Sequence, residues 1–570
     1  METLVVPFRP PLDDWSPESI QRCQDEIRIN LFDQVIVPGE DNEARVDAAG
    51  GLNGTGAQLR SFHQENYYLG GVSIPFTTLY FNSGSLEATL RCNMPIEHVG
   101  YANLKSADSD DDGSIGIGTP RISVDDETPR LKQKSPTRSK AMGEIDQDGV
   151  KKNSQEATFI DLMMTLDPLL PQPVKPFGDT VVTIGSSTDV NDANKRLAQY
   201  VMEWSTKAQN TNAATKQRNF HVFVRNLNSG NTFLSQYLRA QQPPRSGIFS
   251  KPPLTVQKLV RFVSLIPFLN DWHLFDGDKD IWSTSQEFLG INAGDYEEHA
   301  VLLCNYFHWL DRDEPNFHNY LVIGHAVPEG EGVYVLRQDA YKIPQRSVLW
   351  NASTGIGYHV WDEKCPMRDV SLVVSSENIY ANMQHTSRFR DLSWDIETNL
   401  KAWKPFFHVG AIQKSNFALP CVQSRDLAYE ETPTKYIHSV ETEIRETLKL
   451  EIRRWRSSRF TTTFNIDAGM KLGRHLEELE AHMQGQSTEP TNQPNATPAG
   501  TTNVLQELQR TKEISGMPLN VTFTDVDKVV DMNIHWNERA NVEFALAVHV
   551  CGYPNCVLSV WVYFASLVTK

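Results

Sequence analysis

The sequence predicts a multidomain protein, with an all-β region first, an α+β region in the middle and a second α+β region at the end. Its 570 residues exceed what one hydrophobic core ordinarily holds, so several domains are expected. Blocks rich in β-branched and aromatic residues dominate the first part, whereas helical and strand-like patterns are both present after about residue 250. The hydrophobic content of 40% indicates that most of the chain folds.

Charge and cysteine usage exclude several classes of function. The formal net charge of −17 argues against a nucleic-acid-binding surface and against a generally basic face for membranes. Seven cysteines are spread without a CxxC pair, which is typical of a reducing compartment. No signal peptide is visible, and no stretch reaches the ~18 apolar residues of a spanning helix. We therefore expect a soluble cytoplasmic or cytoskeletal protein that is part of a larger assembly.

Residues 1–172 contain three strand-like blocks that resemble parts of a C2 domain, which is a β-sandwich. The blocks are Glu26–Val37, Tyr68–Tyr80 and Thr158–Pro168. Too few strands fit for a complete domain, so an incomplete C2-like sandwich is expected. Residues 104–157 interrupt it without one aromatic residue, which predicts a disordered insertion. The blocks lack the paired aspartates of calcium-dependent C2 domains, so calcium-dependent membrane docking is not expected.

The middle of the chain predicts a helix followed by several strands. Residues 173–250 form a connecting segment, with a helix around Leu197–Trp204 and a strand at Phe220–Val224. Prolines at 243, 244, 252 and 253 mark the start of a domain at 251–425, which opens with a helix over Leu254–Leu269. Strands are expected at 320–326, 333–336 and 347–350. This order is typical of an α+β papain-like or transglutaminase-like core.

The most informative stretch is Gly294–Leu310, GDYEEHAVLLCNYFHWL. Asp295 is a good N-cap, and the two glutamates after Tyr296 favour the positive end of a helix dipole. The residues Ala300, Leu303, Cys304 and Phe307 follow at helical spacing. The pattern predicts a helix whose apolar stripe faces a core.

This stretch resembles the nucleophile helix of the transglutaminase-like superfamily, whose pattern runs G-D-C-x-x-x-A-x-L-L. The alignment places Tyr296 where that cysteine belongs. The superfamily's histidine opens a strand as H-x-W, and Gly332 takes its place before Tyr334. Its aspartate follows an aromatic strand end, where Asn351 follows Trp350. A thiolate, a base and an orienting carboxylate act as one unit, so the resemblance implies a domain without catalytic residues.

We expect this site to persist as a cleft that has no catalytic activity. Its predicted lining residues are Tyr296, Glu297, Gly332, Tyr334, Trp350 and Asn351. The aromatic rings offer contact area for a peptide, or they fill the vacated site themselves.

Two other chemistries are alternatives to this interpretation. A divergent cysteine peptidase or transferase would use Cys304 with His325 or His359, although a cysteine in an apolar stripe is ordinarily a buried small hydrophobe. His299 beside two glutamates suggests a metal, but no HExxH motif or second ligand cluster is present. We therefore predict no metal and no cofactor.

Residues 426–570 predict a C-terminal α+β region. Ile437–Trp455 has apolar residues at three- and four-residue steps, and the basic residues at its end suit the helix dipole or a phosphate or lipid group. Residues 484–503 are rich in Pro, Thr and Asn and predict a flexible insertion. Val542–Val550 and Val557–Leu567 flank a turn signal and predict a β-hairpin.

Long phrases in fixed order carry a closer family resemblance. They include IPFTTLYF at 74–81, RFVSLIPFL at 261–269, EEHAVLLCNYF at 297–307, NVEFALAV at 541–548 and VLSVW at 557–561. With these phrases the chain resembles the C-terminal half of the coiled-coil and C2 domain-containing protein 2A family. The resemblance implies a scaffold of the ciliary transition zone or basal body, needed for cilium assembly and gating. It also implies B9-domain and tectonic-type partners of the Meckel-syndrome-type complex. A lipid-binding C2 module, with weak membrane association, remains an alternative.

Overall fold

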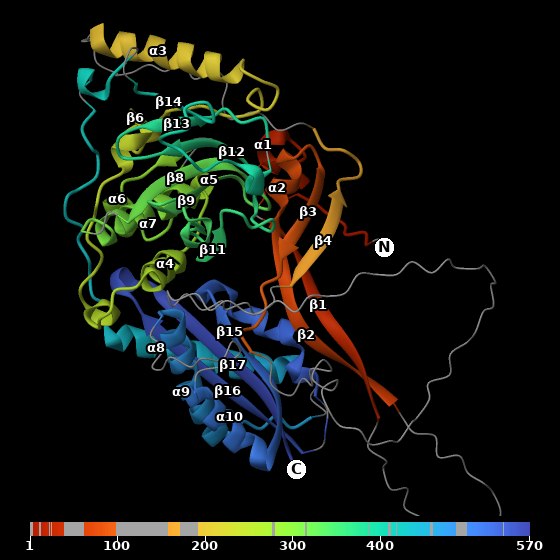
Figure 1. Cartoon of the computed structure of the whole chain (residues 1–570). Coiled ribbons are helices and arrows are strands. Elements are labelled where there is room, and N and C mark those ends of the chain that lie inside the picture. Colours follow the sequence, from red (N-terminus) through yellow and green to blue (C-terminus); the bar gives the residue numbers. More distant parts are fainter. Residues whose placement is uncertain are drawn as a thin grey trace, which may run out of the picture.

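The structure is a computed structural model that describes residues 4–38, 62–97, 158–171, 192–485 and 499–570, with short gaps at 11–12, 22, 24, 276–279, 314–315, 387, 409–411, 418, 457–459, 538 and 540. The insertion predicted at 104–157 lies outside the described residues. Figure 1 shows a central sheet, a C-terminal sheet with its helices, and N-terminal strands that run beside both. Within the described residues, no helix combines the length and apolar character needed to cross a bilayer.

The N-terminal region consists of two antiparallel strand pairs. Short helix α1 (Pro17–Ile20) precedes β1 (Glu26–Pro38), which pairs with β2 (Phe62–Pro75), and β3 (Ser85–Arg91) pairs with β4 (Phe159–Thr165). The predicted strand blocks are confirmed except after Pro75, where residues 76–81 form helix α2 (Phe76–Phe81) instead. Four of its six residues are buried, with Phe76 and Tyr80 in one hydrophobic cluster and Leu79 in another. This tertiary packing outweighs the β-propensity of the individual residues.

The segment before residue 251 packs into the central domain. Helix α3 (Asp192–Gln209) buries the side chains at positions 197, 201, 204 and 208. A small sheet is formed by the strands β5 (Phe223–Asn226), β6 (Asn231–Phe233) and β7 (Ile281–Trp282). Trp204 and Phe233 both contact Phe406 of the central domain, with ring centroids 5.2 Å apart in each case. The predicted connecting segment therefore belongs to the same hydrophobic core as the domain that follows it.

A seven-stranded antiparallel sheet forms the centre of the molecule. Its strand order is β11-β10-β9-β8-β12-β13-β14. The strands are β8 (Phe317–Ala326), β9 (Gly330–Asp339), β10 (Val348–Asn351), β11 (Ile356–His359), β12 (Met367–Val374), β13 (Ile379–Asn382) and β14 (Trp403–Pro405). Helices α4 (Val256–Leu265), α5 (Asp271–Leu274), α6 (Ser285–Ile291) and α7 (Tyr296–Leu310) precede the sheet in the chain. The predicted order of helix and strands is confirmed, and the four strands after β10 have no counterpart among the predicted elements.

The two faces of this sheet support two separate hydrophobic clusters. Along β9, Val333 and Val335 join the cluster that contains α7, whereas Tyr334 and Leu336 join a cluster on the opposite face. This follows from the two-residue period of a β-strand. Helix α7 is buried from Glu298 to Phe307, so the central part of the helix is enclosed on every side rather than along one stripe.

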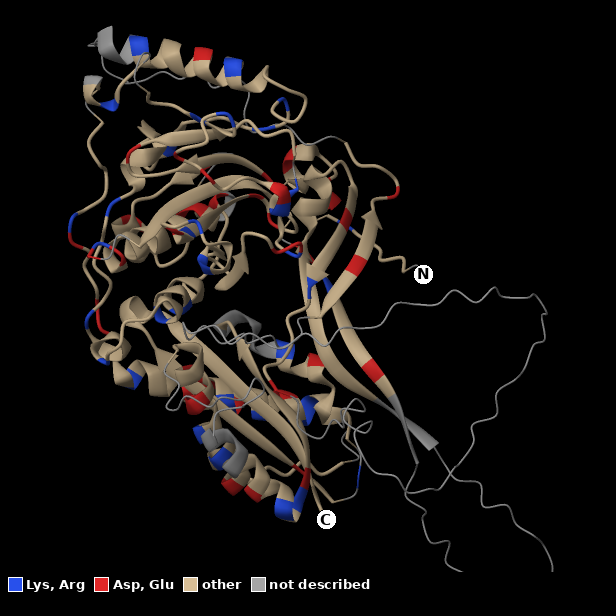
Figure 2. Ribbon diagram, in the orientation of Figure 1, with Lys and Arg blue, Asp and Glu red and all other residues tan. Residues whose placement is uncertain are grey.

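The C-terminal region contains a three-stranded antiparallel sheet of order β15-β17-β16. The strands are β15 (Lys512–Val521), β16 (Val542–Gly552) and β17 (Leu558–Thr569), and the helices are α8 (Thr434–Trp455), α9 (Ile466–Met483) and α10 (Ala499–Thr511). The predicted hairpin and the helix at 437–455 are confirmed. Helix α10 begins inside the insertion predicted at 484–503, so the end of that segment is helical. Figure 2 shows acidic and basic residues interspersed along these helices.

A buried ion pair joins the central and C-terminal regions. Arg261 of α4 donates from Nη2 to Glu480 Oε2 of α9 at 2.8 Å. The same carboxylate accepts hydrogen bonds from Tyr553, Ser559 and Trp561, at 2.5, 2.7 and 2.6 Å. Burial alone would raise the pKa of Glu480, but the Arg261 charge and these donors lower it to about 2. The two regions therefore share one fully hydrogen-bonded polar centre.

Candidate functional site

The start of α7 is fixed by a reciprocal capping box. The Asp295 carboxylate accepts from the backbone N–H of Glu297 at 3.3 Å, and Glu298 Oε2 accepts from the backbone N–H of Asp295 at 3.1 Å. Glu298 Oε1 also accepts from the N–H of Ser283 at 2.8 Å. The prediction that Asp295 caps this helix is confirmed, and the two carboxylates satisfy N–H groups that a helix start leaves unpaired.

Tyr296 occupies the first turn of α7, where the superfamily pattern has a cysteine. Its ring is half-buried and lies 4.6 Å from the ring of Phe268. Burial, together with the nearby charges of Glu329, Asp295 and Glu297, raises the pKa of its phenol well above the ordinary value. A phenol that holds its proton at neutral pH is a poor nucleophile.

Tyr334 and Asn351 are held together by a buried glutamate that the sequence did not single out. Asn351 Nδ2 donates to Glu329 Oε1 at 2.9 Å and to the Tyr334 hydroxyl at 3.0 Å, and that hydroxyl donates to the same Glu329 oxygen at 3.1 Å. Burial raises the pKa of Glu329 despite these bonds. Asn351 Oδ1 accepts from the N–H and the hydroxyl of Ser353, so both ends of this amide are already engaged within the chain.

Gly332 and Trp350 lie on the neighbouring strands β9 and β10. Gly332 pairs with Gly324 on β8, and a Cβ added to Gly332 would meet only the Tyr334 ring, at 4.0 Å. Trp350 packs into the cluster of α7, with its ring 6.5 Å from that of Phe307. Tyr334 belongs to the cluster on the other face of the sheet. The six predicted lining residues therefore do not share one surface, because Trp350 and Tyr334 face opposite sides.

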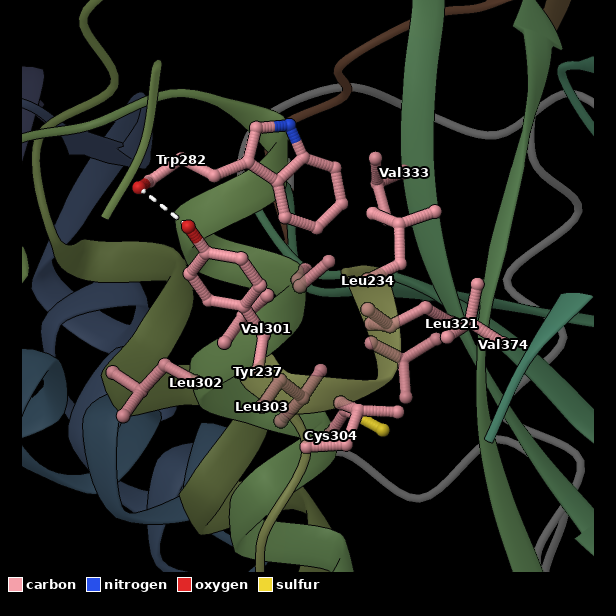
Figure 3. Close-up of a cluster of buried hydrophobic side chains, with 14 of the residues drawn as sticks. Leu234, Tyr237, Trp282, Val301, Leu302, Leu303, Cys304, Leu321, Val333 and Val374 are labelled. Atoms are coloured by element: carbon pink, nitrogen blue, oxygen red, sulfur yellow. Dashed lines mark hydrogen bonds between the residues drawn. The ribbon is translucent and has the colours of Figure 1, made fainter. Parts of the chain in front are cut away.

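Cys304 lies in the interior of the largest hydrophobic cluster. Figure 3 shows its sulfur among apolar side chains that include Leu303, Leu321 and Val374. The residue is 0% exposed, and burial raises the pKa of its thiol far above the ordinary value. Within the described residues, Cys304 makes no hydrogen bond with a histidine; His359 stacks on Trp361. The structure therefore does not form the Cys304–His pair that was weighed as an alternative.

His299 supports the helix start through contacts with two backbone carbonyl groups. Its Nδ1 lies 2.6 Å from the backbone oxygen of Asp295, and its Nε2 lies 3.0 Å from that of Ile266. Burial lowers the pKa of this imidazole. Both ring nitrogens are occupied by backbone carbonyls, so His299 holds α7 against the end of α4.

Three carboxylates that are distant in the sequence meet at this helix start. Oxygens of Asp271, Asp295 and Glu298 all lie within 4.8 Å of one another. Burial raises the pKa of Asp271 to about 6, and burial with neighbouring acids raises the pKa of Asp295 and of Glu298 well above their ordinary values. The sequence motif indicates only two of these acids. Asp271 joins them from the short helix α5, which no periodic pattern in the sequence predicts.

A groove lies in the C-terminal region, away from the predicted cleft. It has a volume of about 890 Å³ and runs between α8, α9 and the edge strand β16. Arg445, Lys449 and Arg453 line it from α8, Gly473 from α9 and Val548 from β16. None of the six residues of the predicted cleft contributes to this groove.

Comparisons with known proteins agree with the order of these regions. A model described as the CEP76 peptidase-like domain matches residues 280–406, and one described as the C-terminal domain of centrosomal protein of 76 kDa matches residues 433–568. Human protein CC2D2B is 25% identical over 575 residues, which cover 100% of this chain and 34% of that protein. The Drosophila melanogaster coiled-coil and C2 domain-containing protein 2A is 28% identical over 340 residues, which cover 57% of this chain and 23% of that protein.

The chain spans about a third of the length of human CC2D2B and less of the fly protein. The peptidase-like match covers α7 and the strands from β8 to β14, and the second match covers the region that contains α8 and β15–β17. These matches follow the same order as the sequence phrases at 261–269, 297–307 and 541–548. The chain is therefore similar, over its whole length, to proteins of the coiled-coil and C2 domain-containing protein 2 family.

Proposed function

We propose that this chain is a non-catalytic scaffold whose transglutaminase-like domain has lost its catalytic residues and serves protein binding. The observation that carries the proposal is Tyr296 at the start of α7, where the superfamily pattern has its nucleophile. Gly332 and Asn351 stand in the positions of the base and the orienting acid. Without a thiolate and an imidazole, the acyl-transfer reaction has neither nucleophile nor base.

A cysteine-reactive electrophile tests the loss of catalysis. The folded chain carries two exposed thiols, Cys421 and Cys556, as internal references for ordinary reactivity. We expect an iodoacetamide probe to label these two within minutes and to leave Cys304 unmodified until the chain is unfolded. Labelling of Cys304 ahead of the exposed pair, abolished in Cys304→Ala, would favour the cysteine peptidase or transferase instead.

We further propose that the scaffold acts at the ciliary transition zone or basal body. The family resemblance supports this, together with the match to a domain of a centrosomal protein. By the same resemblance, the partners would be the B9-domain and tectonic-type proteins of the Meckel-syndrome-type complex. Proximity labelling from the tagged chain in ciliated cells is expected to enrich those proteins. Enrichment of neither class would contradict the placement.

The groove between α8, α9 and β16 is the surface that we assign to protein binding. An edge strand offers backbone hydrogen-bonding groups to an added peptide strand. A Cβ at Gly473 would meet no atom within 4 Å, so Gly473→Trp is expected to fill the groove without disturbing the fold. The variant should reduce the recovery of proximity-labelled partners at an unchanged melting temperature.

Gly290→Trp is the matched control for this variant. Gly290 is exposed on α6, outside the groove, and its Cβ position is equally open. Equal recovery of partners with Gly473→Trp and with the unmodified chain would remove the groove from the proposal.

The N-terminal strands β1–β4 are assigned to a C2-like module in the same proposal. Flotation with anionic liposomes, with and without calcium, separates a scaffolding role from lipid binding. We expect the chain to stay at the bottom of the gradient under both conditions. Flotation in either would favour the lipid-binding alternative.

A further inference from the structure

The acidic cluster at the start of α7 differs from an ordinary capping arrangement in one respect. Two of its members, Asp295 and Glu298, cap the helix, but the third is Asp271 from a different element. Asp271 is 5% exposed, and its Oδ2 accepts from the backbone N–H of Ile281 at 2.5 Å. Its Oδ1 is buried and has no hydrogen-bond partner among the described residues. A buried carboxylate oxygen without a partner is costly, so a ligand at this atom would stabilise the fold.

The charges around this oxygen are of one sign. Within the described residues, no Lys or Arg forms an ion pair with Asp271, Asp295 or Glu298. The adjacent Glu297 adds a fourth carboxylate, whose buried Oε2 also lacks a partner. The dipole at the helix start supplies roughly half a positive charge, which is too little to offset three or four carboxylates. Either protons or a cation must therefore offset the remaining negative charge, beyond the groups that cap the helix.

We propose that Asp271, Asp295 and Glu298 bind a hard divalent cation, Ca²⁺ or Mg²⁺, through their carboxylate oxygens. All three ligands are oxygen donors, and their oxygens converge within 4.8 Å of one another. Oxygen-only carboxylate sites favour these two ions over zinc, which prefers nitrogen and sulfur ligands. The bound ion joins α5 to the first turn of α7.

Isosteric variants separate cation binding from helix capping. Asp271→Asn removes a charge from outside α7 and keeps an oxygen for the Ile281 N–H. Asp295→Asn and Glu298→Gln retain side chains that can still cap the helix. Glu287→Gln is the matched control, because Glu287 closes the equivalent capping box of α6 with Thr284 and is not among the three converging carboxylates.

The experiment titrates the folded chain with CaCl₂ or MgCl₂ after EDTA treatment and follows the melting temperature. We expect a saturable rise of several degrees with at least one ion. Terbium, which binds oxygen ligands as Ca²⁺ does, should show luminescence sensitised by the neighbouring Tyr296. Asp271→Asn and Glu298→Gln should weaken binding at least tenfold, whereas Glu287→Gln should bind as the unmodified chain does.

The proposal would be overturned if neither ion changed the melting temperature of the unmodified chain and the terbium luminescence did not saturate. So would equal affinity in Asp271→Asn and the unmodified chain. If Asp271→Asn fails to fold, Glu298→Gln and the titration of the unmodified chain decide the question. The response to Ca²⁺ against that to Mg²⁺ identifies the ion.

Discussion

Two buried acidic centres in this molecule have opposite electrostatics. Glu480 is surrounded by Arg261 and several neutral donors, and its pKa is lowered to about 2. Asp271 lies among other carboxylates at the start of α7, and burial raises its pKa to about 6. Burial disfavours the charged form at both sites, so the difference comes from the neighbours. A buried acid stabilises a fold only when cationic or donor groups replace its lost water.

Glu329 provides an intermediate case. It accepts hydrogen bonds from Tyr334 and Asn351 but has no cationic partner among the described residues, and its pKa is raised. Neutral donors therefore compensate a buried carboxylate less completely than an arginine does. Single substitutions are therefore expected to have the largest effect at Glu480, a smaller effect of opposite sign at Asp271 and the smallest effect at Glu329.

The largest effect is expected at Glu480, whose buried charge is balanced by Arg261. Arg261→Met removes the cation and leaves the Glu480 charge buried, which should lower the free energy of unfolding by about 3–5 kcal/mol. Urea denaturation followed by circular dichroism measures this change. Arg454→Met is the control, since its contact with Glu451 is an exposed pair that contributes little. A loss below ~1 kcal/mol for Arg261→Met would mean that the neutral donors alone hold Glu480.

The second prediction concerns Asp271, which lies among other carboxylates. Here the substitution should increase the free energy of unfolding rather than lower it. The pKa of Asp271 is raised in the fold above the ~3.9 of an unfolded aspartate, so its stabilising contribution is present at low pH and is lost as pH rises through about 6. In EDTA at pH 7–8, Asp271→Asn should therefore increase the free energy of unfolding by about 2 kcal/mol. Urea melts from pH 4 to pH 8 test this.

The pH profile distinguishes the two centres. The advantage of Asp271→Asn should shrink as the pH falls from 7 towards 4. Glu480 behaves in the reverse way, because its lowered pKa gives stability that is lost only as pH falls from about 4 towards 2. If Asp271→Asn were less stable than the unmodified chain at every pH in EDTA, the like-charge description of the α7 start would be wrong.

The smallest effect is expected at Glu329, which accepts hydrogen bonds from neutral donors. Tyr334→Phe removes one donor to Glu329 and leaves the ring packed in its cluster, which should cost about 1 kcal/mol. Glu329→Gln removes the charge that these donors compensate only in part, and its cost should be smaller or absent. Thermal denaturation of both variants provides the comparison. A larger loss for Glu329→Gln than for Tyr334→Phe would place Glu329 with Glu480 instead.

The sequence predicted the helices and strands best where apolar periodicity was long. Glu26–Val37, Ile437–Trp455 and Gly294–Leu310 all correspond closely to observed elements. The prediction was wrong at residues 76–81, where strand-forming residues form a short helix because their side chains are buried by other parts of the chain. It also missed α9, whose side chains are buried by a sheet that forms only later in the chain.

The candidate site was predicted in part. The motif correctly placed Asp295 at the helix start and Asn351 at the end of β10. It treated Tyr334 and Trp350 as neighbours in one cleft, although register puts them on opposite faces of the sheet. Glu329 and Asp271 were missed because each belongs to a turn or a short helix without a pattern of its own.

The amino-acid sequence by itself determined the family resemblance, the order of the regions and the absence of a cysteine at the start of α7, because these are properties of residue identity along the chain. The tertiary structure alone decided which acids meet which neighbours. Asp271 and Asp295 are 24 positions apart, and Arg261 and Glu480 are 219 apart. Whether a buried carboxylate is stabilised or strained depends on groups within a few ångströms of it, and only folding sets those distances.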